Sequence, residues 1–465
     1  MSAVVMKFGG SSVADADAIR RVLSIVSAAR DRGHAPVVVV SALGGATDRL
    51  LGLAETASRG HTDADELVRE GLFALTQRHL VEAASLGLDR DRALADAMES
   101  SFQDLRETLD AIRQRRRADP VSLDVIAAAG ELLSSRLVAA AMAAEGLPAV
   151  WVDARSVIVT DDRHTCAIPM MDETNASVAA LVAPLVAEGR IPVLGGFIGR
   201  TADGTTTTLG RGGSDYSASL VGAGLGAAEI QIWTDVDGML TADPRIVHEA
   251  EIVRHLSFAE AAELAYFGAK VLHPSTIFPA VDRKIPVRIL NSRRPDNEGT
   301  RIVADPPPGH RPFAALASKR GITVIDITST RMLMAHGFLR RVFEVFETYE
   351  TAVDVVTTSE VSVSVTIDDD RRAAAIVAAL LEIAEVRVEE QMAILAVVGD
   401  RLAIDSSLAA RVLGSLRGFP LRMVSQAASR RNVTIVLPQS YLRAAMTHLH
   451  QELFGVAEAQ PEGRR

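Results

Sequence analysis

The sequence predicts an α/β fold with a largely parallel central sheet, followed by two smaller α+β units. Short apolar runs alternate with helical patterns over residues 1–295, which is typical of α/β domains. These runs are rich in β-branched residues and are continuous rather than alternating, as in strands that are buried on both faces. The predicted strands are Val4–Phe8, Val37–Ser41, Ala149–Asp153, Ile191–Gly195, Ile230–Thr234 and Val287–Leu290.

Helical patterns separate the strands. The predicted helices are Ala16–Arg30, Glu131–Glu145, Ala176–Glu188 and Phe258–Ala265. Between about residues 62 and 117 no strand pattern occurs, and Ala, Leu, Glu and Arg recur at helical spacing, so this stretch is predicted to be a helical insertion. Its basic end, Arg113 with Arg115–Arg117, is either a patch for an anionic ligand or a solvated helix end favoured by the macrodipole.

A domain boundary is predicted near residues 293–311, where proline, glycine and charged residues mix. Two successive βαββαβ patterns follow, over residues 313–390 and 391–455. The second pattern lacks its final strand, and the apolar run at about 313–318 is the natural donor, so the two units are expected to interlock. Their predicted strands are Ile322–Ile327, Val353–Thr357, Val361–Ile367, Val386–Glu390, Ile394–Val398, Leu421–Gln426 and Val433–Leu437, and their predicted helices are Phe338–Tyr349, Arg371–Leu381, Leu408–Leu416 and about Ser440–Glu452.

Composition narrows the class of protein. Of the 465 residues, 48% are hydrophobic and 23% are charged, as expected for a multidomain protein with a well-formed core. The net charge of −10 argues against nucleic acid as the main partner, because phosphate binding needs a basic excess. The single cysteine, Cys166, excludes an internal disulfide and fits a reducing compartment. With neither a signal peptide nor an uninterrupted apolar run of about 18 residues, the chain is expected to be cytoplasmic.

Three glycine turns follow predicted strands. Lys7 ends the first strand and precedes Gly9–Ser11, a sequence that suits a nucleoside triphosphate because glycine backbones approach phosphate closely and lysine adds charge. A plain turn between strand and helix explains the glycines equally simply, and the Walker A spacing is absent. The turns at Gly44–Thr47 and Gly195–Gly199 have the same layout, so all three are expected at the ligand-binding edge of the sheet. Gly222–Gly226 follows a helical pattern and is predicted to be a helix end.

The segment Leu209–Ala218 has the highest density of functional residue types. Arg211 lies between glycines and is suited to a bidentate grip on a carboxylate or phosphate. Ser214 and Asp215 can cap a helix, which is the alternative explanation for them. Further along, the sequence Asp235–Gly238 after a strand forms a turn, or holds Mg²⁺ or a ribose.

Four motifs in this order, K-F-G-G-S-S-V, G-R-G-G-S-D-Y-S, W-T-D-V-D-G and F-G-A-K-V-L-H-P, resemble the aspartate kinases of the amino-acid kinase superfamily. The C-terminal part resembles the paired ACT regulatory domains of the lysine-sensitive type, with Gly337–Leu339, Val353-Asp354 and Thr357–Ser362 matching. The resemblance covers essentially the whole chain. It implies a catalytic domain over residues 1–295, with helices on both faces of the sheet, and ACT domains over 313–390 and 391–455.

The resemblance also implies the reaction: ATP-dependent phosphorylation of the L-aspartate side-chain carboxylate to 4-phospho-L-aspartate, the first step toward lysine, threonine and methionine. ATP would carry Mg²⁺, and no separate metal site is expected. No homoserine dehydrogenase extension follows, so a monofunctional enzyme is expected. A homodimer or dimer of dimers through the ACT domains is expected, with lysine or threonine as effector, because unpaired sheet edges favour pairing between chains.

The matching residues fall into four groups. The catalytic residues would be Lys7, Asp215 and Lys270. The ATP-binding residues would be Lys7, Phe8, Gly9, Gly10, Ser11, Thr234, Asp235, Leu240, Arg245, Lys270 and Val271. The substrate-binding residues would be Thr47, Glu131, Arg211, Gly212, Gly213 and Ser214. The allosteric residues would be Met332, Phe338, Leu339, Val353, Asp354, Ser359 and Glu360.

Some positions allow other interpretations. Without the resemblance, Glu131 is equally well explained as a helix-start glutamate, and Asp354 and Glu360 as solvated surface residues. Leu240 stands where relatives often place a tyrosine, and Ala335 and Ala352 stand where lysine-inhibited relatives commonly place serines. The rival functions are a kinase for glutamate or acetylglutamate, which predicts neither the ACT units nor the insertion, and an inactive amino-acid sensor, which would not need Lys7 or Arg211.

Overall fold

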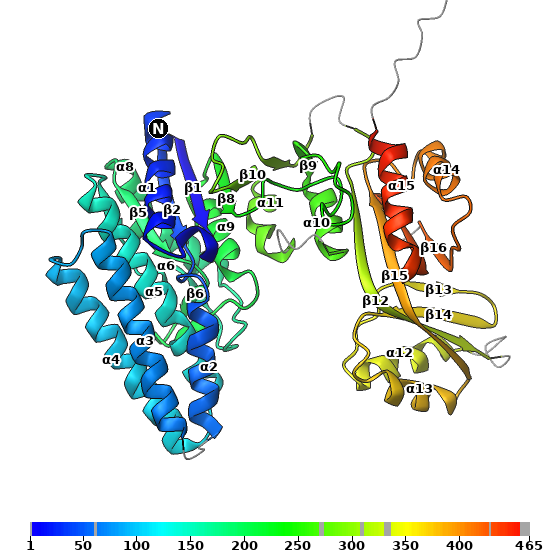
Figure 1. Cartoon of the computed structure of the whole chain (residues 1–465), viewed down its shortest axis with the longest axis horizontal. Helices are drawn as coiled ribbons and strands as arrows, with labels where there is room; N and C mark the ends of the chain where they lie inside the picture. The colour runs from blue at the N-terminus through cyan, green and yellow to red at the C-terminus, as the bar shows by residue number, and fades with distance from the viewer. Residues whose placement is uncertain are drawn as a thin grey trace, which may run out of the picture. The chain divides into compact units, whose positions relative to one another are not determined.

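The computed structural model describes residues 2–59, 63–268, 274–306, 311–329, 336–426 and 429–455 (Figure 1). The chain divides into two compact units. The first comprises Met1–Met239, Arg254–Phe258 and Val271–Pro306, and the second comprises Leu240–Val253, Ala259–Lys270 and Pro307–Arg465.

The first unit is built on an eight-stranded sheet in the order β3-β5-β2-β1-β8-β10-β11-β9. Its central strands, from β3 to β10, are all parallel, and only β11 runs antiparallel to its neighbour β10, which confirms the predicted sheet. The strands are β1 (Ser2–Phe8), β2 (His34–Val40), β3 (Ala149–Trp151), β5 (Ile191–Gly195), β8 (Glu229–Thr234), β9 (His255–Ser257), β10 (Val287–Asn291) and β11 (Thr300–Val303).

Helices pack against this sheet, and a large apolar core runs from the sheet into the helical layer. The predicted insertion contains two long helices, and Arg113 in it pairs with Asp65 and Asp110, so this part of its basic end is held by carboxylates. The helices of the unit are α1 (Ala16–Asp31), α2 (Ala46–Arg59), α3 (Ala64–Ser85), α4 (Arg92–Arg115), α5 (Pro120–Ala144), α6 (Ala154–Val157), α7 (Met171–Ser177), α8 (Ala183–Ala187), α9 (Gly213–Leu225) and α11 (Phe278–Asp282), with short helical turns at Gly10–Val13, Val178–Val182 and Pro274–Ile277.

Helix α5 begins eleven residues before its predicted start. Asp119 caps it by accepting the Ser122 N–H at 2.9 Å, and Pro120 occupies the first turn, where no N–H is needed. Glu131 therefore lies in mid-helix and is not a helix-start glutamate. The helix is long and apolar enough to cross a membrane, but 78% of its most apolar window is buried inside the protein, as in a core helix.

The predicted helix Ala176–Glu188 is divided. It begins earlier, as α7, widens into a π-helical turn at Val178–Val182, and continues as α8. Pro184 lacks a backbone N–H and cannot continue a regular helix at this point. At the other glycine-rich segment, Gly226 ends α9 in the left-handed conformation, which confirms the predicted helix end.

A second, three-stranded sheet in the first unit is absent from the sequence prediction. It contains β4 (Val159–Thr160), β6 (Ile198–Thr201) and β7 (Thr206–Thr208), in the order β4-β6-β7. These strands are short, and β7 consists of threonines only, so they lack the apolar run that identified the other strands.

The second unit contains a six-stranded antiparallel sheet in the order β13-β14-β12-β15-β17-β16. Its strands are β12 (Ala315–Thr328), β13 (Val356–Thr358), β14 (Ser362–Ile367), β15 (Glu385–Val398), β16 (Met423–Ser425) and β17 (Asn432–Pro438). The sequence predicted a strand at Val353–Thr357, but regular pairing begins only at Val356.

Two strands of this sheet are longer than the sequence indicated. The apolar runs on either side of Arg320 were expected to be two strands, but they form one strand, β12. The runs on either side of Gln391 were also expected to be two strands, and they form β15. Gly321 and Gln391 have positive φ angles of 69° and 57°, and the register shifts beside Gly321. The polar residues that resemble a loop in the sequence are therefore an irregularity within a continuous pair of strands.

Helices α12 (Phe338–Thr348) and α13 (Ala373–Leu381) form one apolar core of this unit with β12 and β14. Helices α14 (Ser406–Ser415) and α15 (Leu442–Phe454) form another with β15 and β17, and a short turn at Gln439–Tyr441 precedes α15. Helix α10 (Phe258–Tyr266) spans the sequence junction between the two units.

Candidate active site

The three glycine turns lie at one edge of the parallel sheet, as predicted. Each is bonded to the end of the neighbouring strand. The Gly9 N–H donates to Trp233 O at 3.1 Å, the Ser41 N–H to Phe8 O at 3.0 Å, and the Gly196 N–H to Val40 O at 2.8 Å. Because the strands are parallel, their carboxyl ends meet here, and the side chains that follow them are brought together.

A cavity of about 530 Å³ opens at this edge in the first unit. Nine of the sequence-predicted site residues line it: Lys7, Gly10, Thr47, Glu131, Arg211, Gly212, Gly213, Ser214 and Asp215. The whole predicted substrate group is among them. The cavity is also lined by Ser41, Asp48 and Phe197, which were not predicted as site residues. Phe197 belongs to the predicted Gly195–Gly199 turn, Ser41 ends the predicted strand Val37–Ser41, and Asp48 directly follows the Gly44–Thr47 turn.

Lys7 and Asp215 form an ion pair in the cavity wall. Lys7 Nζ lies 2.7 Å from Asp215 Oδ1, and the two side chains are 11% and 13% exposed. Lys7 is the last but one residue of β1, and Asp215 lies in the first turn of α9. The carboxylate therefore holds the ammonium at a fixed place beside the cavity.

Glu131 is the most perturbed group of the site. Its side chain is 3% exposed, and its Oε2 has no hydrogen-bond partner within the described part of the chain. Burial raises the pKa of Glu131 from 4.5 to about 8, although an Ala42 N–H and the charge of Lys7 act in the opposite direction. A buried carboxyl with an unused oxygen in a cavity wall is suited to receive a cationic group from a ligand.

The glycines around Arg211 shape the rim of the cavity. Gly210 and Gly212 have φ angles of 71° and 73°, which favour glycine. A Cβ on Gly213 would lie 2.6 Å from the Phe197 ring, so this backbone needs glycine for space. The side chain of Arg211 is exposed and makes no hydrogen bond or ion pair with the described residues, so its guanidinium is available to an anion.

Hydroxyl groups connect the turns beneath the cavity. The Ser41 hydroxyl donates to Ser214 Oγ at 3.2 Å, and the Ser134 hydroxyl donates to Ser41 O at 2.8 Å. A Cβ on Gly196 would lie 2.6 Å from the Ser214 Cβ, so the third turn must also be glycine for α9 to begin where it does. The N-terminus of α9 is thus fixed against two strands.

Several predicted nucleotide residues do not line the cavity. Phe8 is fully buried and stacks on Trp233, with ring centroids 5.9 Å apart, so its side chain is not accessible to a ligand. Gly9, Ser11, Thr234 and Asp235 lie at the same sheet edge, after β1 and β8. Leu240 and Arg245 belong to the second unit, where Arg245 pairs with Asp243 at 2.8 Å. Lys270 and Val271 lie outside the described residues.

Asp237 has a structural role. Its side chain accepts from the Asn291 and Asn297 amides at 2.7 and 2.9 Å and pairs with Arg294 at 2.5 Å. Gly238 has a φ of 133°, and a Cβ there would lie 2.6 Å from Thr300 Oγ1. This segment is therefore a tight turn. No group of three or more His, Cys, Asp or Glu side chains suited to a metal ion occurs among the described residues.

The predicted effector residues have different surroundings within the second unit. Phe338 is buried in the core of β12, β14, α12 and α13, whereas Leu339 is 40% exposed. The side chain of Asp354 is only 6% exposed: Lys319 Nζ lies 2.8 Å from its Oδ1, and the Tyr266 hydroxyl donates to the same atom at 3.2 Å. It is therefore not a solvated surface residue. The remaining members of the group are exposed Ser359 and Glu360, half-buried Val353, and Met332, which lies outside the described residues.

Comparison with known proteins identifies the family. The sequence matches the amino acid kinase family over residues 2–291 and the ACT domain over residues 395–453. It is 35% identical to lysine-sensitive aspartokinase 3 of Escherichia coli, over 97% of this chain and 99% of that protein. The chain belongs to the aspartokinases.

Solved aspartokinases share the fold of this member of the family. E. coli aspartokinase III in complex with lysine and aspartate, in its T-state, has a TM-score of 0.82 to this chain, with 35% identity over 97% of this chain and 99% of the other. The same enzyme with aspartate and ADP, in its R-state, has a TM-score of 0.80 at the same identity and coverage.

The buried carboxyl of Glu131 predicts a pH-dependent effect on the stability of this aspartokinase. Glu131 ionises near pH 4.5 in the unfolded chain but near pH 8 in the fold, so its stability penalty grows as the pH rises from 4.5 to 8. Glu131→Gln removes this penalty. The variant should therefore gain free energy of unfolding relative to the natural chain, on the order of a few kcal/mol at pH 8 and little at pH 5.

Denaturant unfolding at pH 5 and pH 8 measures this difference. Glu145→Gln, at the exposed end of the same helix, is the matched control and should behave alike at both pH values. A stability gain in Glu131→Gln that does not change with pH would contradict the raised pKa.

Proposed function

We propose that this chain transfers the γ-phosphoryl group of ATP to the side-chain carboxylate of L-aspartate. The observation that carries the proposal is the meeting of three groups in one cavity: the Lys7–Asp215 pair, the buried carboxyl of Glu131 and the exposed guanidinium of Arg211. Together they offer a cation for the phosphoryl group, an acceptor for an ammonium and a bidentate donor for a carboxylate. The E. coli relative solved with aspartate and ADP supports the same pair of substrates.

The chemistry needs positioning more than acid–base catalysis. The attacking group is a carboxylate with an ordinary pKa near 3.9, so it is ionised at neutral pH without a general base. The two reacting groups are both anionic, and phosphoryl transfer is accelerated mainly by alignment and by stabilising the developing charge. Lys7, held by Asp215, is placed to provide that charge, and Lys270 is proposed as a second cation. Magnesium would arrive with ATP and screen its phosphates.

Substrate recognition follows from the other two groups. Arg211 would bind the α-carboxylate of aspartate in a bidentate manner, and Glu131 would accept its ammonium. The unpaired Oε2 of Glu131 supports this role, because an incoming ammonium would favour the ionised form of a carboxyl whose pKa burial raises to about 8. The backbone N–H groups at the start of α9 add further donors for an anion.

We also propose which parts of the chain catalyse the reaction and which parts regulate it. Residues 1–295 would catalyse, and the ACT domains over 313–390 and 391–455 would bind an amino-acid effector. Among the described residues, the outer strands of the second sheet, β13 and β16, have one unpaired edge each. This supports a homodimer through these domains, which sedimentation analysis can measure. A place at the start of lysine, threonine and methionine synthesis, in the cytoplasm, completes the proposal.

The first prediction concerns the acceptor. With MgATP and L-aspartate the protein should form an acyl phosphate, which hydroxylamine traps as a hydroxamate. L-Glutamate should react far more slowly, because one extra methylene displaces the nucleophile in a site that clamps both ends of the amino acid. Equal rates with the two amino acids would refute the aspartate assignment.

The second prediction separates two roles by steady-state kinetics. Arg211→Ala should mainly raise the KM for aspartate, because the guanidinium would grip the substrate before and during reaction. Lys7→Ala should mainly lower kcat, by about 10²- to 10³-fold, because its charge acts on the transferring group. Unchanged aspartate kinetics in Arg211→Ala would eliminate its role as a clamp.

The third prediction concerns the effector. Lysine is the proposed ligand, but Ala352 offers no hydroxyl and Asp354 already pairs with the ammonium of Lys319. Ala352→Ser should restore one hydrogen bond and lower the Kd for lysine by about 2- to 12-fold. Titration calorimetry measures this Kd, with threonine and methionine as comparison ligands. An unchanged Kd for lysine would show that position 352 does not contact it.

A further inference from the structure

A buried carboxylate outside the cavity is not explained by the proposed chemistry. Asp124 lies on α5 seven residues before Glu131, which places the two carboxyl groups two turns apart on one side of the helix. Asp124 is fully buried. A helix in the core of a domain rarely carries an isolated buried carboxylate, so its partners identify its role.

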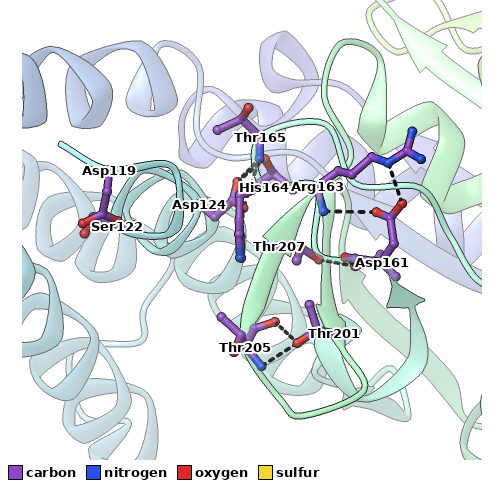
Figure 2. Close-up of polar contacts among 12 residues, drawn as sticks. Asp119, Ser122, Asp124, Asp161, Arg163, His164, Thr165, Thr201, Thr205 and Thr207 are labelled. Atoms are coloured by element: carbon purple, nitrogen blue, oxygen red, sulfur yellow. Dashed lines mark hydrogen bonds and ion pairs between the residues drawn. The ribbon is translucent and has the colours of Figure 1, made fainter.

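Asp124 binds two separate segments of the chain. His164 Nδ1 donates to its Oδ2 at 2.7 Å, and the Thr165 N–H donates to its Oδ1 at 3.0 Å, as Figure 2 shows. The Thr208 hydroxyl, at the end of β7, donates to Oδ1 at 2.5 Å. The carboxylate therefore joins α5, the loop around His164 and the last residue of β7.

The loop is compact and closed by its own ends. Two hydrogen bonds join its first and last residues. The Asp161 N–H donates to Ile168 O at 3.0 Å, and the Ile168 N–H donates to the Asp161 carboxylate at 2.8 Å. At the tip, Thr165 has a φ of 71°, which is strained for a β-branched residue. The hydrogen bond from its N–H to Asp124 helps to hold this conformation.

The loop also supports the segment that carries Arg211. The Ala167 N–H donates to Thr208 O at 2.9 Å, which attaches the loop to the end of β7. Two residues later, a Cβ built on Gly210 would lie 3.4 Å from Thr165 O and 3.5 Å from the Cys166 Cα, so the backbone of Gly210 rests against the loop tip. Arg211 follows directly.

We propose that Asp124 is a positioning residue for substrate binding. Asp124 holds the Asp161–Ile168 loop and Thr208 together. This contact fixes the position of the Leu209–Gly213 backbone, and therefore the position of Arg211 at the cavity. Asp124 does not touch the substrate, and the proposal rests on the proposed function only in taking aspartate as the ligand of Arg211. The loop and Asp124 belong to no motif by which the family was recognised.

Two matched threonine variants test this proposal. Thr208→Val removes the hydroxyl bonded to Asp124. Thr201→Val removes a hydroxyl bonded to Asp203 at the far end of the same β6–β7 hairpin, which is the control. Both variants lose a hydrogen bond between threonine and aspartate. Thr201→Val also loses the bonds of its hydroxyl with the Thr205 backbone, so it should lower the thermal unfolding temperature at least as much as Thr208→Val. Only Thr208→Val should raise the KM for aspartate, by roughly 5- to 50-fold, with the KM for ATP nearly unchanged.

A pair of His164 variants gives a second test that leaves the buried hairpin intact. His164→Ala removes the donor to Asp124 and should also raise the KM for aspartate. His164→Asn keeps an N–H near the position of Nδ1 and should restore it. If Thr208→Val folds poorly, this pair decides the question. Equal aspartate KM values for Thr208→Val and Thr201→Val, or for His164→Ala and His164→Asn, would overturn the proposal.

Calorimetry that measures the affinity for aspartate tests the role of Asp124 independently of the proposed reaction. If the natural chain binds aspartate but does not phosphorylate it, the proposed reaction fails, while the affinities of the four variants still test Asp124. If the natural chain is an active aspartate kinase and the variants bind aspartate as tightly as it does, only the role of Asp124 is refuted.

Discussion

The parallel register of β1 with β2 and β8 is the constraint on which the site depends. It places Phe8, Val40 and Trp233 at one sheet edge, and the turn that follows each strand then bonds to the neighbouring strand end. This arrangement leaves little freedom in the turns, and Gly196 is required because a side chain there would collide with Ser214. Lys7 gains its position from the same register, since it is paired with Val39 of β2 and Ile232 of β8 and cannot shift without breaking both ladders.

The two ionisable groups Lys7 and Glu131 at this edge of the sheet are stabilised to different extents. Lys7 has Asp215 as its partner, whereas Glu131 is buried with an unsatisfied oxygen and a pKa raised to about 8. The fold therefore carries an energetic cost for ionised Glu131, which protonation relieves and which a ligand cation would also relieve. Such a cost is typical of binding sites, where stability is given up so that the ligand completes the interactions of the protein.

The sequence predicted the parallel sheet and the meeting of the three glycine turns at its edge well, because both depend on local patterns: continuous apolar strands and the glycine turns that follow them. It failed where the pattern was interrupted or absent. The polar residues around Gly321 resembled a loop but lie within β12, and the threonine strand β7 carried no apolar signal. Asp124 could not be recognised from sequence, because its partners His164 and Thr208 are 40 and 84 residues away.

The long strands of the second unit determine how its two halves can respond to a ligand. β12 and β15 each contribute to both cores, and their pairing runs from Ala315 and Val398 to Thr328 and Glu385. Hydrogen-bonded strands resist sliding because a shift by one residue would turn every apolar side chain to the wrong face. Asp354 pairs with Lys319 of β12, two residues before Gly321, so a change at Asp354 would act on the strand pair close to its irregularity.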